Sequence, residues 1–329
     1  MSITSERLTT AILWPKISTR GVLMNTNSHI SKQYSISFSG HDSFPLRHGW
    51  LEKAYKEVME RSDGNPFTAE DSVVKFGVGK NMVNAIKHWA TASNFLVKVE
   101  NGYVPSRFAK KLMVGLDPYL ENVNSLWKVH YELAKTPSNT TIYWIFSLMN
   151  VQSFSKEYLE LKLQEFCVEQ DKSIPAKKSL RTDVNVALAL YCRADSAKGI
   201  GEDDISSPLH ELKLLSVNTD GSYSVNTSAK KSLSDELFMH ALIDFWEADD
   251  VEAGMQSTSI RADRLIYEER APARIFALSE FELLERVGRM PALSDGMLST
   301  SETAGVVQIF KNQETYNADA LKEMWMSDE

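Results

Sequence analysis

The sequence predicts a mainly α protein with small β-hairpin wings, in which tandem winged helix-turn-helix modules precede a helical C-terminal domain. Apolar residues recur at spacings of three and four in successive segments, which is typical of amphipathic helices. Short alternating segments turn at Asn101-Gly102 and Asp220-Gly221, and such pairs favour hairpins. We expect an N-terminal tail at 1–35, a first winged-helix domain at 36–115, an aromatic connector with a second winged-helix domain at 116–232, and an acidic helical domain at 233–329.

The composition is that of a globular protein with local rather than general affinity for nucleic acid. The chain has 329 residues, a formal net charge of -8 and 43% hydrophobic residues. An acidic balance argues against indiscriminate coating of nucleic acid, so any such contact must come from local basic patches. The two cysteines, Cys167 and Cys192, lack partners for a metal site, which suits a reducing cytoplasm. No apolar segment has the roughly 20 residues of a membrane span, and the start of translation stays open between Met1 and Met24.

The first module is predicted from a helix at 46–60, a helix at 69–76, a turn at Gly77-Val78-Gly79 and a helix at 80–95. The hairpin at 97–106 supplies a wing, and Thr68 is expected to cap the second helix. The helix at 80–95 has an apolar face formed by Met82, Val83, Ile86, Trp89 and Ala90. Its opposite face carries Lys80, Asn84, Lys87, His88 and Thr91.

That opposite face favours DNA binding, because an asparagine amide can pair with an adenine edge and lysines contact phosphates. From Lys75 to Lys111 there are seven lysines and arginines and one acidic residue, Glu100. The alternative is a solvated helix in an ordinary small domain.

The second module repeats this order less clearly. Two buried aromatic helices are expected between 116 and 150, separated by 136–140, followed by helices at 156–171 and 176–193 and by a hairpin. Six basic and two acidic residues lie between Lys172 and Lys198, so a second basic face is predicted. The predicted DNA-binding residues of both modules are Lys75, Lys80, Asn81, Asn84, Lys87, His88, Thr91, Lys98, Arg107, Lys110, Lys111, Lys177, Lys178 and Arg181.

The last segment is expected to serve packing or protein contact. From Leu233 to Glu329 it has 20 acidic and 8 basic residues, which is unsuited to lie along phosphate. Helices are predicted at 234–248, 258–271 and 278–289, followed by a strand at 303–312 and a terminal helix.

Four segments resemble an uncharacterised-domain family encoded in bacterial DNA phosphorothioation gene clusters: FSGHDSFPLRHGWLEKAYK, VVKFGVGKNMVNAIKHW, DPYLENVNSLWKVHYEL and SPLHELKLLSV. The resemblance runs from about Phe38 to Trp325. It implies a protein that nicks double-stranded DNA in an antiphage defence system, beside a cysteine desulfurase, an ATPase and a sulfur transferase. A nick would open the backbone so that sulfur can replace a non-bridging phosphate oxygen. The resemblance carries no catalytic residues over to this chain.

The segment GHDSFPLRH holds the only short cluster suited to cutting DNA, which requires an activated water and stabilisation of the phosphate charge. In this hypothesis His41 acts as base or ligand, Asp42 binds Mg²⁺ or Mn²⁺, and Arg47 and His48 clamp phosphate. The alternative is a structural turn at Gly40-His41-Asp42, with Arg47 making a simple phosphate contact.

Other nuclease signatures are weaker. The triplets Glu160-Leu161-Lys162 and Glu211-Leu212-Lys213 have the E-x-K form of restriction-like nucleases, with Asp203 or Asp204 upstream of the second, but they lie in helical patterns. Three functions therefore stay open: a metal-dependent DNA-nicking enzyme, a non-catalytic DNA reader that recruits the modification machinery, and a transcriptional regulator.

Overall fold

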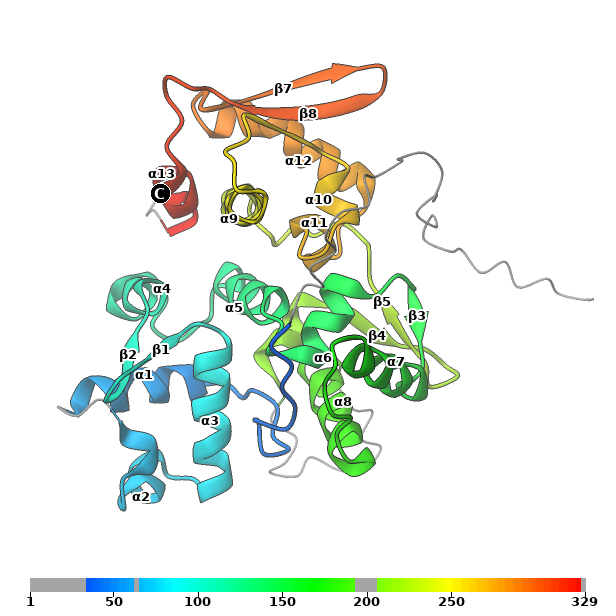
Figure 1. Ribbon diagram of the computed structural model, residues 1–329. Helices are drawn as coiled ribbons and strands as arrows, with labels where there is room; N and C mark the ends of the chain where they lie inside the picture. The colour runs from blue at the N-terminus through cyan, green and yellow to red at the C-terminus, as the bar shows by residue number, and fades with distance from the viewer. Residues whose placement is uncertain (1–33, 62–64, 193–205, 327–329) are drawn as a thin grey trace, which may run out of the picture.

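The computed structural model describes residues 34–61, 65–192 and 206–326. The fold is mainly helical with small antiparallel sheets, as predicted (Figure 1). Residues 1–33 of the predicted tail, which include Met24, lie outside the described residues, as do Asp203 and Asp204. Tyr34 and Ser35, which the prediction placed in the tail, are described and belong to an extended segment. Within the described ranges, no helix is both long enough and apolar enough to cross a membrane.

Three helices and a hairpin follow one another in the predicted order in the first unit. They are α1 (Trp50–Glu60), α2 (Ser72–Phe76), α3 (Lys80–Ala92), β1 (Leu96–Val99) and β2 (Gly102–Pro105). Gly77 ends α2 with a left-handed φ of 62°, which glycine adopts at little cost. On α3 the buried residues are Val83, Ala85, Ile86, Trp89 and Ala90, so the predicted core face is confirmed except that Met82 is half-buried.

The start of α2 differs from the prediction. A 3-10 turn occupies Pro66–Thr68, Asp71 takes the N-cap position, and no side chain caps the helix. Thr68 is therefore not a cap. The proline at the first position of the turn begins a separate local element, and the helix starts three residues later than the capping pattern indicated.

The centre of the molecule is α5 (Val123–Lys135), which lies between the first unit, the second unit and the C-terminal helices (Figure 1). Every residue from Ser125 to Ala134 is buried. After a turn comes α6 (Thr140–Tyr143), continued by a wide helical turn at Trp144–Leu148. The two predicted aromatic helices are thus present, and their rings form core.

The second unit consists of two longer helices and a small sheet. It comprises α7 (Lys156–Glu169), α8 (Lys177–Tyr191), a 3-10 turn at Pro208–Leu212, β4 (Leu215–Val217) and β5 (Tyr223–Val225). The predicted hairpin turn is present, with Gly221 at a φ of 80°. A short strand that was not predicted, β3 (Ser153–Phe154), pairs with β5 and completes the sheet order β3-β5-β4.

The C-terminal part packs its helices against a three-stranded antiparallel sheet of order β6-β8-β7. Its elements are α9 (Asp235–Ala253), β6 (Ser259–Arg261), α10 (Arg264–Tyr267), α11 (Pro272–Ile275), α12 (Glu280–Leu293), β7 (Leu298–Thr303), β8 (Val306–Lys311) and α13 (Ala318–Glu323). A short helix α4 (Arg107–Lys111) connects the wing to the centre.

The single helix predicted at 258–271 is wrong. Residues 259–261 form β6 instead, because their backbone pairs with β8 some 50 positions later, from Ser259↔Phe310 to Arg261↔Gln308. Only Arg264–Tyr267 is helical, and Pro272 starts the next helix. The predicted strand at 303–312 is present as β8, with β7 as its unpredicted hairpin partner.

Candidate nucleic-acid interface

An extended N-terminal strap, residues 34–49, lies between α3 of the first unit on one side and α6 and α8 of the second unit on the other, where α6 is the helix that follows α5 at the centre (Figure 1). The strap contains the GHDSFPLRH cluster. The amide of Ser37 donates to Thr140 Oγ1 over 2.9 Å, and the amide of Ser39 donates to Asp183 Oδ1 over 2.7 Å. The predicted catalytic cluster is therefore attached directly to the second unit.

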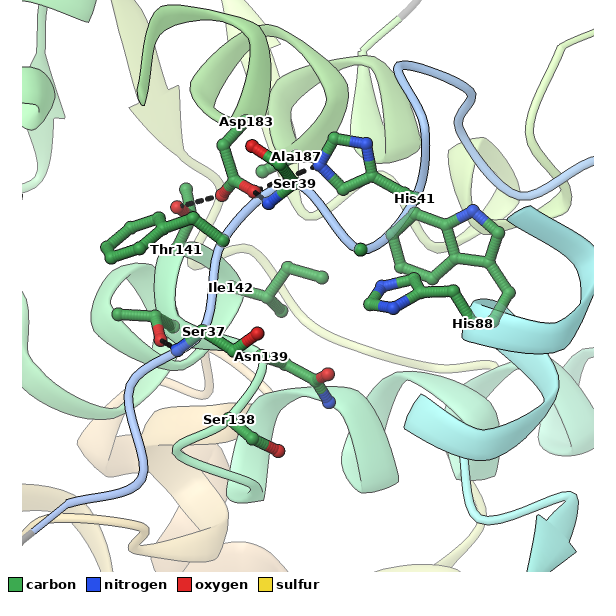
Figure 2. A pocket seen from close by; sticks show the side chains of 14 residues that line it. Ser37, Ser39, His41, His88, Ser138, Asn139, Thr141, Ile142, Asp183 and Ala187 are labelled. Atoms are coloured by element: carbon green, nitrogen blue, oxygen red, sulfur yellow. Dashed lines mark hydrogen bonds and ion pairs between the residues drawn. The ribbon is translucent and has the colours of Figure 1, made fainter. Parts of the chain in front are cut away.

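His41 is buried, with 4% of its surface exposed, and its ring is held at both nitrogens. Nε2 lies 2.9 Å from Asp183 Oδ1, and Nδ1 accepts from the amide of Ser43 over 3.2 Å. In the neutral ring this assigns the proton to Nε2. Thr141 Oγ1 donates to Asp183 Oδ2 over 2.5 Å, and Figure 2 shows Asp183 between His41 and Thr141. Asp183 thus accepts three hydrogen bonds from the strap and α6.

Asp42 points the other way, to α3. Its backbone has a positive φ of 45°, and its Oδ2 accepts from Asn84 Nδ2 over 2.9 Å. His41 and Asp42, adjacent in sequence, therefore join opposite units, and the amide predicted to contact an adenine is bonded to the strap.

His88 also lies against the strap rather than in solvent. A Cβ added at Gly40 would stand 2.5 Å from His88 Nδ1, so a side chain at this position would force the His88 ring to move. Burial, with the neighbouring His41 as a lesser cause, lowers the pKa of His88 to about 4. Its ring is neutral at pH 7 and carries no charge for a phosphate. Figure 2 shows it facing a small hollow of about 20 Å³, room for roughly one water.

Arg47 and His48 end the strap in different surroundings. The Arg47 guanidinium lies 5.7 Å from the ring centroid of Phe44 and 5.5 Å from that of Trp50, a cation-π arrangement. His48 is exposed and lines a cleft of about 680 Å³ together with residues of the turn at Pro208–Leu212. Of the four predicted catalytic residues, the structure brings His41 and Asp42 into the unit interface and places His48 in an open cleft.

The predicted DNA-binding lysines fall into two groups. Within the described residues, most have no carboxylate partner, namely Lys80, Lys87, Lys98, Lys110, Lys111, Lys177 and Lys178. Three cationic residues are paired: Lys75 with Asp71 at 3.3 Å, Arg107 with Glu323, and Arg181 with Glu160 at 3.1 Å. Asn81 is exposed, and Thr91 Oγ1 donates to Lys87 O over 2.9 Å.

In the C-terminal part, the lysines and arginines are paired rather than unpaired. From 233 to 326, each arginine and lysine has a carboxylate or backbone carbonyl within hydrogen-bonding distance. Unpaired positive charge is thus concentrated in the first two units, while the acidic domain neutralises its own cations.

The described residues do not form a magnesium site by themselves. Within the part of the chain that the structure describes, no three histidine, cysteine, aspartate or glutamate side chains converge in a way that could hold a metal ion. Asp42 offers one carboxylate, with Oδ2 already accepting from Asn84. Because magnesium is commonly held by one or two carboxylates, waters and substrate phosphates, the protein alone supplies an incomplete ligand set.

Sequence comparison gives the family. The model of a protein family of unknown function, DUF4007, matches residues 38–325. The chain belongs to the DUF4007 family. This confirms the family resemblance found in the sequence and its extent. Among curated proteins, none matches this DUF4007 chain.

Two solved structures are similar to this DUF4007 member. A crystal structure of magnesium-ion-bound SspB has 26% sequence identity and a TM-score of 0.77, covering 91% of this chain and 90% of that chain. A second SspB crystal structure, also 26% identical, has a TM-score of 0.74 and covers 88% of each chain.

Sequence reasoning missed Asp183, the acceptor that holds the strap. A signal was present: Leu180, Val184 and Ala187 form an apolar stripe on α8, and Asp183 is the one carboxylate within it. A carboxylate on a buried helical face needs donors from elsewhere in the fold. The sequence did not indicate that these donors would come from residues 39, 41 and 141.

Proposed function

We propose that this protein binds duplex DNA through its first two units and nicks it during bacterial DNA phosphorothioation. The distribution of unpaired lysines carries the proposal. Lys80 and Lys87 of α3 and Lys177 and Lys178 of α8 lack carboxylate partners within the described residues, whereas the acidic domain has its cations paired. Lysines without such partners can neutralise DNA phosphates and so release the counterions bound to DNA. The free energy of this counterion release dominates non-specific affinity for DNA.

The similarity to SspB supports the phosphorothioation context. In that context, the partners are the sulfur-transfer and ATPase proteins of the same gene cluster. A nick would expose the backbone to the sulfur-transfer step. The order of helices and hairpin in the first unit supports a winged-helix mode of binding, with the N-terminal end of α3 at Lys80 and Asn81 nearest the DNA.

Magnesium or manganese is proposed as the cofactor, with Asp42 as its protein ligand and DNA phosphates completing the site. When bound, such an ion would stabilise the charge that develops on phosphate. The side chains of the strap serve to position groups. His41 and Asp42 hold the strap against α8 and α3, and the strap in turn positions Arg47 and His48.

The proposal is tested by incubating the purified full chain with supercoiled plasmid, with and without Mg²⁺ or Mn²⁺. We expect conversion to open circles, detected on agarose gels, and its loss when the metal is chelated. Absence of open circles at high purity with either metal, together with intact DNA binding, would contradict the nicking activity.

A non-catalytic reader that recruits the modification machinery is the second candidate. The burial of His41 and the engagement of both its nitrogens favour it, because a general base must reach the proton it abstracts. A transcriptional regulator would use the same lysines without cutting. Neither alternative predicts open-circular product.

A further inference from the structure

The cleft at the end of the strap brings together titratable residues from two segments that are far apart in sequence. His48 follows the strap, and His210, Glu211 and Lys213 belong to the turn at Pro208–Leu212 and the residue after it. The cleft has a volume of about 680 Å³, within the range of ligand-binding clefts. Both segments are among those on which the family resemblance was based.

The side chains of this cleft favour an anionic ligand. His48 and Lys213 are exposed, and within the described residues neither has a carboxylate partner. Glu211 is the single carboxylate among the residues that line the cleft, which also include Lys213 and the exposed imidazole of His48. A phosphodiester would therefore find donors for its oxygens and little repulsion.

The backbone at the cleft is fixed. Lys213 has a left-handed φ of 50°, and its carbonyl accepts from Asn226 Nδ2 over 2.9 Å. His210 Nε2 donates to the carbonyl of Ala189 over 2.8 Å. His210 in the turn and Lys213 directly after it are thus held in place before any ligand binds.

The remaining reactive group, Cys192, is unsuited to act as a nucleophile. Burial raises the pKa of its thiol to about 11, so the thiolate is scarce at pH 7. This leaves the imidazole of His48 as the exposed base of the cleft, and phosphodiester hydrolysis as chemistry that its residues can support.

We propose that this cleft binds the phosphodiester that is cut, with His48 as the general base and Lys213 as the ligand of a phosphoryl oxygen. The inference rests on the proposed nicking function and assigns a site to it other than the buried His41. A water attacks phosphorus and passes its proton to His48. The bond from phosphorus to one sugar oxygen breaks, and that oxygen takes a proton from solvent water.

The test compares His48→Gln, Lys213→Ala and the control Lys231→Ala in the full chain. Lys231 is exposed, does not line the cleft and, among described residues, has no acidic partner. We expect His48→Gln to slow plasmid nicking by about 100-fold or more while DNA affinity changes less than about twofold. Lys213→Ala should slow nicking by about tenfold or more, and Lys231→Ala should leave it unchanged. Wild-type rates in His48→Gln would overturn the assignment and leave the nicking function intact.

A second readout does not depend on cutting. The histidine ring signals of the wild-type protein are followed by NMR as a short duplex oligonucleotide is added, and His48→Gln identifies the His48 signal. A shift of the His48 signal at saturation supports phosphate binding in the cleft, even if the wild-type protein fails to nick under any metal condition. An unmoved His48 signal at saturation would overturn the inference.

Discussion

At the residue scale, Asp183 is the acceptor on which the attachment of the strap depends. It lies on α8 and accepts from the amide of Ser39, from His41 and from Thr141. All three donors would lose their partner together if the carboxylate were removed, and buried donors without a partner cost more than the net value of the bonds themselves.

We therefore expect Asp183→Ala to lower the free energy of unfolding by about 1–3 kcal/mol, and to increase amide exchange in residues 37–44. Urea unfolding and hydrogen exchange followed by mass spectrometry measure the two effects. Glu302→Ala, on the exposed strand β7, is the control and should change neither. An Asp183→Ala protein as stable as the wild type would show that the strap is not held this way.

The sequence was sufficient to single out GHDSFPLRH and to offer two interpretations, a catalytic cluster and a structural turn. It was not sufficient to choose between them. The deciding partners, Asp183 for His41 and Asn84 for Asp42, lie 142 and 42 positions away. Local pattern cannot give such pairings, because they depend on how two units pack.

At the element scale, α3 shows which part of a helix can be predicted from periodicity. Its apolar face was predicted almost completely, because burial of Val83, Ile86 and Trp89 follows directly from their spacing. Its polar face was expected to be free, but the strap covers Asn84 and His88. The same limit explains the error at 258–271, where pairing with β8 overrode a helical pattern.

Lys80 and Lys75, five positions apart, allow a matched comparison on DNA. Lys80 lacks a carboxylate partner within the described residues, whereas Lys75 is paired with Asp71. We expect Lys80→Ala to weaken DNA binding and to reduce the slope of log affinity against log salt by about 1, and Lys75→Ala to have the smaller effect. Fluorescence anisotropy at several salt concentrations measures both. Equal effects of the two substitutions would show that an ion pair with a neighbouring carboxylate does not determine which lysines contact DNA.

At the scale of the whole molecule, the buried His130 and the half-buried His240 join α5 to its neighbours. His130 lies between Tyr191 OH at 2.8 Å and the carbonyl of Ile275 at 2.9 Å, and so connects α8, α5 and α11. His240 of α9 lies 2.6 Å from Lys128 Nζ of α5. Burial is the main cause that lowers the pKa of His130 to about 4 and that of His240 to about 3.

These shifts predict how stability depends on pH. The ordinary histidine pKa near 6.5 applies in the unfolded chain, and the lowered pKa applies in the folded chain. At a pH between these two pKa values the unfolded chain binds more protons than the folded chain. The free energy of unfolding is therefore complete above pH 6.5 and falls as the solution becomes more acidic. From pH 7 to pH 5 the loss is up to about 2 kcal/mol for each such histidine. Urea unfolding at pH 7, 6 and 5 measures it, in a range where most carboxylates remain ionised. A constant free energy of unfolding would contradict the burial of these rings.

The central claim is that the first two units, and not the acidic domain, contact DNA. It rests on the distribution of charge over the whole molecule. Lysine acetylation of the intact protein, read by mass spectrometry with and without duplex DNA, tests it most directly. The account predicts that DNA protects Lys80, Lys87, Lys177 and Lys178, while Lys322, which is paired with Glu247 in the acidic domain, reacts equally in both conditions. Unchanged reactivity of the four lysines in saturating DNA, or protection confined to the acidic domain, would contradict it.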